Sequence, residues 1–120
     1  MAYLLHVRFD FNGTAGNAQK DVATAFPFEP ATKKMNSLPN LKWKIWAVNA
    51  DYPGEHPEAS GFYLYPTKEA AESRAAEAKS TLPLISPFIS SVQTTVWEVL
   101  DDYSLATHAP IDVPLISELT

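Results

Sequence analysis

The amino-acid sequence predicts one α+β domain over residues 1–120, with its elements in the order β-α-β-β-α-β. Three observations lead to this prediction. Four segments alternate in side-chain character with the two-residue period of a strand. Segments rich in helix-forming residues separate the first strand from the second and the third from the fourth. The length suits a single hydrophobic core. This order of elements is that of the ferredoxin-like fold, in which an antiparallel sheet carries its helices on one face.

The first predicted strand covers residues 3–11, where every second side chain from Leu5 to Phe11 is apolar. Alternate side chains of a strand point to opposite faces of its sheet. We therefore expect the apolar set to face the core. The other set, which includes His6 and Arg8, faces either water or a site.

Turn-forming residues follow at 12–16, and two short helices are predicted over residues 17–26 and 31–38. Pro27 and Pro30 separate these helices, because proline cannot continue a helical hydrogen-bond pattern.

The second and third predicted strands cover residues 41–49 and 60–65, and a loop containing proline and glycine joins them. Both faces of the second strand contain apolar side chains, so alternation alone does not identify which face points to the core. We assign to the core the set Leu41, Trp43, Ile45 and Ala47. In the third strand, Phe62 and Leu64 oppose the tyrosines at positions 63 and 65.

A helix is predicted over residues 68–79, with Thr67 as its N-cap. Its apolar residues are mostly alanines, so the helix should pack close to the sheet. Pro83 and Pro87 are interpreted as a connector to the fourth strand.

The fourth strand is predicted over residues 92–100, with Trp97 in the core. Residues from about 104 to 120 are expected to form a C-terminal tail. Prolines at positions 110 and 114 prevent a long helix there, and the apolar residues between 111 and 116 can dock on the domain.

Composition narrows the possible functions. The net charge of −5 argues against nucleic acid or an anionic membrane as the main partner, because proteins bind both through clustered lysine and arginine side chains. The absence of cysteine excludes disulfides, thiolate catalysis and cysteine-bound metals. No segment is apolar enough to span a bilayer or to act as a signal peptide, so we expect a cytoplasmic protein.

The face of the sheet opposite the core is expected to combine aromatic and basic side chains. Such a surface is too aromatic for a typical solvent-exposed face and usually marks a partner or a ligand. Two sheets packed face to face would cover it and could enclose a cavity. The residues assigned to this face are His6, Arg8, Lys44, Trp46, Tyr63 and Tyr65.

Three segments, LLHVRFDFNG, LKWKIW and ASGFYLY, have the order and approximate spacing found in one known family. In these segments the sequence resembles the YdhR-like monooxygenases, which belong to the dimeric α/β-barrel proteins together with the antibiotic-biosynthesis monooxygenases. The similarity extends from about Tyr3 to about Tyr103. Its most specific elements are Trp43-Lys44-x-Trp46 and Phe11-Asn12-Gly13.

The sequence departs from this family in two regions. Prolines interrupt the segment between the first and second strands, where the family has a continuous helix, and residues 112–120 extend beyond the shared part. Both regions could reshape the mouth of a pocket, so the choice of substrate is not carried over.

The resemblance implies a homodimer with a cavity between sheet and helices or inside the barrel. It also implies oxygenation of a small aromatic or polyketide-like substrate by O2 without a cofactor. In this chemistry the protein stabilises the anion of a phenol, quinol or anthrone, which reduces O2, and a hydroperoxide then collapses to a quinone.

Such a site needs a base or cation, aromatic walls and a dry pocket. His6 is the candidate base, because its ordinary pKa lies near neutral pH. Arg8 and Lys44 are candidate partners of the anion. The candidate substrate-binding residues are Trp46, Tyr63, Tyr65 at the rim and Asn12, whose first role is in the turn. The three histidines lie far apart in the sequence, so no metal site is expected.

Structural roles compete with these assignments. His6 could serve only as a hydrogen-bonding residue, and Arg8 could pair with Asp10 or Glu98. An error of one residue in strand phase would exchange the faces. Other functions also remain open: a protein that only binds small hydrophobic ligands, an isomerase or cyclase, or a haem-degrading enzyme. The last ranks lowest, because neither main predicted helix carries a histidine for the iron.

Overall fold

The computed structural model describes residues 1–11, 28–49, 58–85 and 89–119. Within these ranges the chain forms four strands, three α-helices and a terminal 3-10 turn. The helix predicted over residues 17–26 lies outside them. The elements are β1 Tyr3–Phe11, α2 Phe28–Asn36, β2 Trp43–Asn49, β3 Glu58–Tyr65, α3 Lys68–Ile85, β4 Ile89–Glu98, α4 Asp101–Ala106 and η1 Ile116–Leu119.

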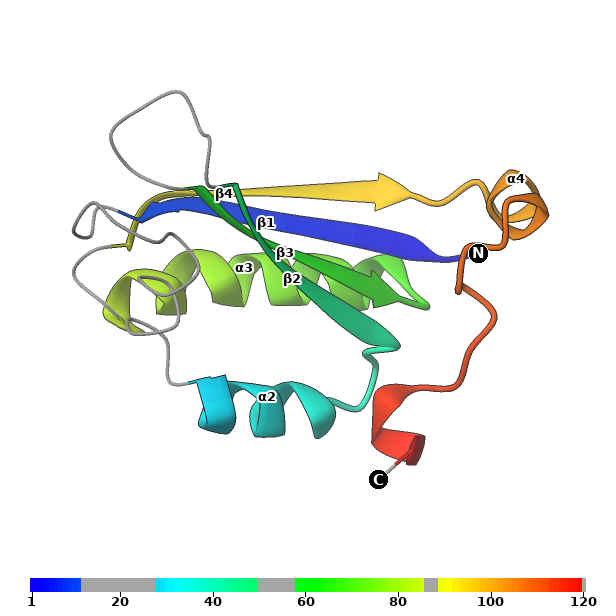
Figure 1. Ribbon diagram of the computed structural model, residues 1–120, viewed down its shortest axis with the longest axis horizontal. Coiled ribbons are helices and arrows are strands. Elements are labelled where there is room, and N and C mark those ends of the chain that lie inside the picture. Colours follow the sequence, from blue (N-terminus) through cyan, green and yellow to red (C-terminus); the bar gives the residue numbers. More distant parts are fainter. Residues whose placement is uncertain (12–27, 50–57, 86–88, 120) are drawn as a thin grey trace.

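The strands form one antiparallel sheet in the order β2-β3-β1-β4. Figure 1 shows α2 and α3 on the same side of this sheet, and no helix of the described residues lies across the other side. The predicted ferredoxin-like fold is therefore confirmed. We call the side toward α2 and α3 the helix face and the opposite side the open face.

Helix α3 packs tightly on the sheet because its inner surface consists of small residues. Ala71, Ala75 and Ala78 are buried and recur at helical spacing. The Thr67 hydroxyl accepts a hydrogen bond from the Ala70 amide at 3.2 Å, which confirms the predicted N-cap. The helix is longer than predicted, since it continues through Pro83 to its end at residue 85.

Helix α2 stands further from the sheet than α3 and begins and ends earlier than the predicted 31–38. An ion pair between Lys34 and Glu77 at 3.3 Å links it to α3. Met35 and Leu38 pack against the main core cluster around Leu5. Residues of α2 also line one cavity together with residues of β2 and β3, so α2 lies opposite these two strands.

The side chains of strand β1 face the sides that were predicted. Its pairing with β3, and that of β3 with β2, then determines which side chains of these two strands face the helices. Leu5, Val7 and Phe9 are buried on the helix face. Leu5 pairs with Tyr63 of β3, which in turn pairs with Lys44 of β2. Directly paired residues of adjacent strands point to the same face. Tyr63 and Lys44 therefore lie on the helix face.

The predicted phase of β2 and β3 is thus wrong by one residue. Lys44, Trp46, Tyr63 and Tyr65 point toward the helices and do not share a face with His6. The assignment of core-facing side chains failed because both faces of these two strands carry large apolar side chains. Pairing with β1, rather than hydrophobicity, decides which set faces inward.

The two other tryptophans also lie outside their predicted positions. Trp97 is 56% exposed and pairs with Leu4 on the open face. Trp43 lies on this face as well, and its indole donates a hydrogen bond to the Pro110 carbonyl at 2.8 Å. Ile45, expected in the core, is 52% exposed there.

The C-terminal segment docks on the sheet, as predicted for its apolar residues. Ile111 is buried in a cluster with Ala2 and Leu64, and its carbonyl accepts a hydrogen bond from the Lys42 amine at 2.7 Å. Further along, the Ile116 amide donates to the Leu41 carbonyl at 2.8 Å. Figure 1 shows this segment passing from α4 to the vicinity of α2.

Docking of this segment predicts a measurable contribution of Ile111 to stability. Ile111→Ala should lower the free energy of unfolding by about 2–4 kcal/mol, because it leaves a cavity beside Leu64. Urea denaturation measures this change. The control is Leu119→Ala in the same segment, where the side chain is exposed and the expected change is below about 0.5 kcal/mol. Equal effects of the two substitutions would contradict the docking.

Candidate functional site

A cavity of about 240 Å³ lies between the helix face and the two helices. Its wall combines apolar side chains of α2 and α3 with aromatic and basic ones. Such a space suits a small, flat and mainly apolar ligand. The lining residues with functional groups or large side chains are Lys34, Met35, Lys44, Trp46, Tyr63, Arg74 and Leu82.

The amine of Lys44 lies over two aromatic rings in this cavity. It is 3.3 Å from the centroid of the Trp46 ring and 4.5 Å from that of Tyr63. Burial lowers the pKa of Lys44 to about 7, and the positive charge of Arg74 acts in the same direction. The aromatic faces favour the charged amine. A lysine in this setting can hold or release a proton near neutral pH.

Gly61 of β3 makes room for this arrangement. A Cβ atom at this position would lie 3.1 Å from Cε of Lys44 and 3.1 Å from a ring carbon of Tyr63. Both distances are shorter than ordinary van der Waals contacts. Glycine in the middle of a strand often marks such a close approach. Gly61 therefore helps to set the position of the amine against the ring.

The hydroxyls of Tyr63 and Tyr65 remain neutral over the physiological range. Burial raises the pKa of Tyr63, and the neighbouring Tyr65 raises it further. Burial also raises the pKa of Tyr65, while the positive charge of Arg74 opposes this shift. The two rings are nearly parallel, with centroids 6.2 Å apart. Both tyrosines can thus act as hydrogen-bond donors.

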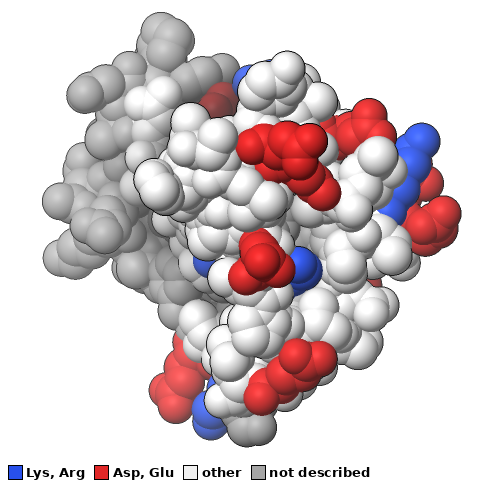
Figure 2. Space-filling view, turned by 90° about the vertical axis from the view of Figure 1, so that its right-hand side faces the viewer, with Lys and Arg blue, Asp and Glu red and all other residues white. Residues whose placement is uncertain are grey.

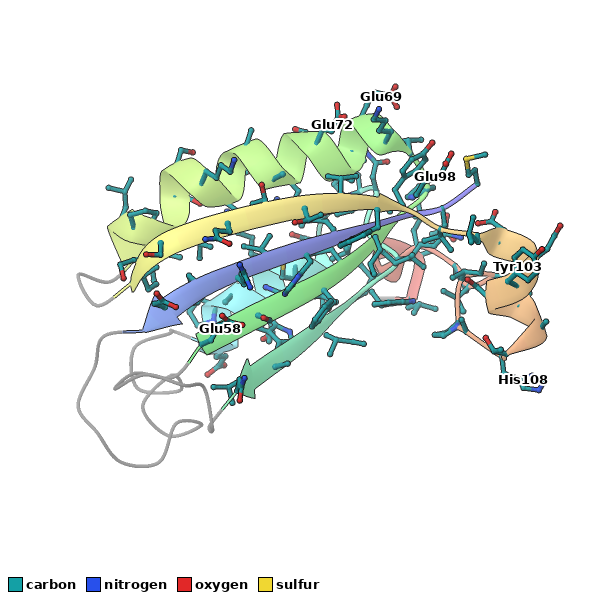
Figure 3. All side chains as sticks on the ribbon, turned by 90° about the horizontal axis from the view of Figure 1, so that it is seen from above. Glu58, Glu69, Glu72, Glu98, Tyr103 and His108 are labelled. Carbon is teal, nitrogen blue, oxygen red and sulfur yellow. The ribbon has the colours of Figure 1, made fainter. Side chains whose placement is uncertain are left out.

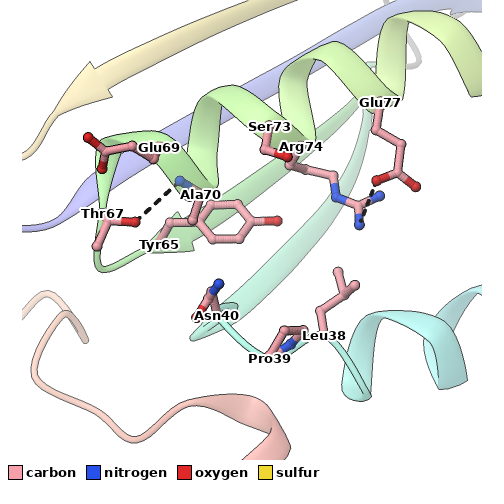
Figure 4. Close-up of a pocket in the computed structure, with 10 residues that line it drawn as sticks. All are labelled: Leu38, Pro39, Asn40, Tyr65, Thr67, Glu69, Ala70, Ser73, Arg74 and Glu77. Atoms are coloured by element: carbon pink, nitrogen blue, oxygen red, sulfur yellow. Dashed lines mark hydrogen bonds and ion pairs between the residues drawn. The ribbon is translucent and has the colours of Figure 1, made fainter.

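A second, more polar hollow of about 380 Å³ adjoins the cavity. Figure 4 shows Tyr65 at its centre, with Arg74 and Glu77 above and the segment around Asn40 below. Arg74 lines both spaces. Its guanidinium lies 3.4 Å from the carboxylate of Glu77.

The structure divides the predicted site residues among three places. Lys44, Trp46 and Tyr63 meet in the cavity, and Tyr65 lies in the adjoining hollow. His6 and Arg8 lie on the open face, on the other side of the sheet. Asn12 lies outside the described residues. The predicted site is therefore not a single cluster.

On the open face, His6 and Arg8 have structural partners. The His6 ring stacks on Phe62, and its Nε2 lies 3.0 Å from the Ser60 hydroxyl. Burial lowers the pKa of His6, with Arg8 acting in the same direction. Arg8 donates hydrogen bonds to Gln93 and lies 3.9 Å from Glu58, so neither expected partner of this arginine is observed among the described contacts.

Sequence reasoning missed Arg74, although a signal was present. Arg74 follows Ala71 by three residues and precedes Ala78 by four, so it belongs to the buried alanine stripe of α3. A charged residue within an apolar stripe usually has a paired or functional role. Its side chain is only 10% exposed.

Within the described residues, no three histidine, cysteine, aspartate or glutamate side chains form a group that could hold a metal ion. The described helices also include none that is long and apolar enough to cross a membrane. Figure 2 shows the end of the molecule that carries α4, where most of the surface is uncharged and acidic groups are scattered. No broad basic patch appears on this side.

The sequence matches the family model described as "Putative mono-oxygenase ydhR" over residues 4–110. This match covers most of the chain, and the protein therefore belongs to that family. Comparison with curated proteins gives no match.

Solved structures similar to this one share its fold at low sequence identity. The de novo designed protein Foldit4 has a TM-score of 0.57 and 9% identity, covering 82% of this chain and 99% of that chain. SnoaB, a cofactor-independent oxygenase from Streptomyces nogalater, has a TM-score of 0.53 and 12% identity, covering 82% and 92%. A dimeric ferredoxin-like protein of unknown function from Jannaschia sp. CCS1 has a TM-score of 0.51 and 15% identity, covering 81% and 99%.

The environment of Lys44 predicts an unusual titration. In protein labelled with ¹³C-lysine, the Cε signal of Lys44 should titrate with a midpoint near pH 7. The spectrum of Lys44→Arg identifies this signal by its absence. A midpoint above about 9, close to that of an ordinary lysine, would contradict the assigned environment.

Proposed function

We propose that the protein is a monooxygenase that uses O2 without a cofactor to oxidise a small hydroxylated aromatic or polyketide-like substrate in the cavity. The observation that carries this proposal is the Lys44 amine held between Trp46 and Tyr63 against an otherwise mostly apolar wall. Membership of a monooxygenase family supports it. So does the shared fold with SnoaB, which is itself described as a cofactor-independent oxygenase.

Lys44 would act first, as the base and then as the partner of the anion. With a pKa of about 7, a large fraction of the amine is neutral at physiological pH and can accept a phenolic proton. The resulting ammonium remains beside the phenolate, where the low dielectric strengthens their attraction. Arg74 adds positive charge to the same cavity, and Trp46 provides a flat wall for the ring.

The electron-rich anion would then reduce O2 directly. A carbon–oxygen bond forms at a ring carbon that carries hydrogen, such as the CH2 carbon of an anthrone, and the distal oxygen takes up a proton to give a hydroperoxide. Loss of water leaves a carbonyl at that carbon. One oxygen atom enters the product, the other leaves as water, and the substrate supplies all four electrons. The protein's contribution is to bind, orient and deprotonate the substrate.

His6 and Arg8 would have a different role in this proposal, as part of a dimer interface. The open face exposes Ile45 and Trp97, and His6 and Phe62 lie half-buried between them. Exposed aromatic and aliphatic side chains of this size usually have a partner. Packing the open faces of two copies would cover them. Figure 3 looks onto this face, with Glu58 at one end and Tyr103 and His108 near the other.

Oxygen consumption tests the proposed reaction. Metal-free protein with an anthrone, quinol or naphthol should consume O2, and Lys44→Met should lower kcat/KM about 100-fold or more, since the base is lost. Lys68→Met is the matched control, because Lys68 lies on the surface of α3 in an exposed pair with Glu72. It should leave the rate unchanged.

The His6→Ala/Arg8→Ala double variant separates the two faces of the sheet. Near-normal uptake by this variant as an assembled dimer would agree with catalysis in the cavity. Uptake lost in this variant but retained in Lys44→Met would contradict it. Ligand binding without any uptake would favour the alternative of a protein that only binds small hydrophobic molecules.

The dimer has its own test. Trp97→Glu combined with Ile45→Glu should shift the protein from dimer to monomer in sedimentation experiments, because the carboxylates would be buried without partners. Leu84→Glu is the control, as Leu84 is 83% exposed at the end of α3, away from the open face. A monomeric wild type at micromolar concentration would rule out the proposed assembly.

A further inference from the structure

The polar hollow beside the cavity contains a hydrogen-bonding group without a described partner. The Tyr65 side chain is only 3% exposed, and its hydroxyl makes no hydrogen bond within the described part of the chain. Buried polar groups are nearly always hydrogen-bonded, and exceptions often have a functional explanation. In Figure 4 the ring of Tyr65 extends into the hollow toward Arg74.

The Arg74 side chain interacts with this hydroxyl and opposes the rise in its pKa, but no hydrogen bond of ordinary geometry reaches the hydroxyl within the described part of the chain. A buried hydroxyl without a partner destabilises the folded protein, so phenylalanine at this position would be the more stable choice. Tyr65 also cannot ionise easily, because burial raises its pKa. The hydroxyl is therefore available as a neutral donor for a group that enters the hollow.

Arg74 supplies a second set of donors at the same place. One nitrogen of its guanidinium pairs with Glu77, whose carboxylate also contacts Lys34. A guanidinium carries five N–H donors, so others remain for a ligand. Because Arg74 lines both spaces, a ligand held in the cavity can reach it.

The charges around the hollow decide which acceptor fits. Besides Arg74, the carboxylates of Glu69 and Glu77 line the space. Glu77 is already paired with Arg74 and Lys34, so a further carboxylate on the ligand would be repelled by Glu69 and would compete with Glu77 for Arg74. An uncharged carbonyl oxygen can accept hydrogen bonds from Tyr65 and Arg74 without this repulsion.

We propose that Tyr65 and Arg74 form a subsite for an uncharged carbonyl oxygen of a ligand whose phenolic ring lies in the adjoining cavity. This inference deepens the proposed function and rests on it for the placement of the ring. The substrate class is then a fused-ring phenol with a ketone on the neighbouring ring.

Equilibrium binding of two ligands that differ by one oxygen atom tests the subsite. 6-Hydroxy-1-tetralone has the carbonyl, and 5,6,7,8-tetrahydro-2-naphthol lacks it. Wild-type protein should bind the ketone about 10-fold more tightly, as expected for a well-placed hydrogen bond. Tyr65→Phe should abolish this preference while keeping the affinity for the tetrahydronaphthol. Tryptophan fluorescence without turnover is a sufficient readout.

Tyr3→Phe is the matched control. Tyr3 pairs with Tyr65 on the same face of the sheet, but its hydroxyl contacts Met1 and does not line the hollow. This variant should keep the full preference for the ketone. A wild type without any preference, or a Tyr65→Phe variant that retains it, would overturn the subsite. Tighter binding of 6-hydroxytetralin-1-carboxylic acid than of the ketone would overturn its uncharged character.

Thermal unfolding gives a second, independent readout. Tyr65→Phe without ligand should be at least as stable as the wild type, because the substitution removes an unsatisfied buried group. A clear loss of stability would mean that the hydroxyl has an internal partner and would overturn the proposal. Failure of oxygen uptake together with ketone-specific binding would reject the oxygenase reaction and keep the subsite.

Discussion

The pairing of β1 with β3, and of β3 with β2, determines where every candidate functional group lies. Leu5 is buried against α3, Tyr63 lies opposite Leu5, and Lys44 lies opposite Tyr63. A shift of one residue in either pairing would move the amine to the open face. The buried apolar side chains of β1 thus determine the position of Lys44, two strands away in the sheet. No residue of β1 is among those that line the cavity.

The two helices give this cavity its shape by packing at different distances. The alanine stripe lets α3 lie close to the sheet, whereas α2 is linked to α3 through Lys34 and Glu77. Arg74 interrupts the stripe and carries its charge to the boundary between the cavity and the hollow. Small residues for packing and one long basic residue for the site therefore occur on the same helix surface.

The element order, the N-cap of α3 and the inward row of β1 could be predicted from the sequence, because each depends on local patterns. The faces of β2 and β3 could not. Trp43 and Trp46 are equally apolar, so alternation contains no information about which one faces the helices. Trp97 shows the same limit, since the open face carries exposed side chains that are typical of a core. Arg74 was predictable from its position among buried alanines.

The three tryptophans allow the central claim, that the ligand site lies on the helix face, to be tested in one measurement. Trp46 lines the cavity, while Trp43 and Trp97 lie on the open face. In ¹H–¹⁵N spectra of the indole groups, titration with 2-naphthol should shift the Trp46 signal and leave the other two in place. A shift of the Trp97 signal with Trp46 unchanged would place the ligand on the open face and contradict this account.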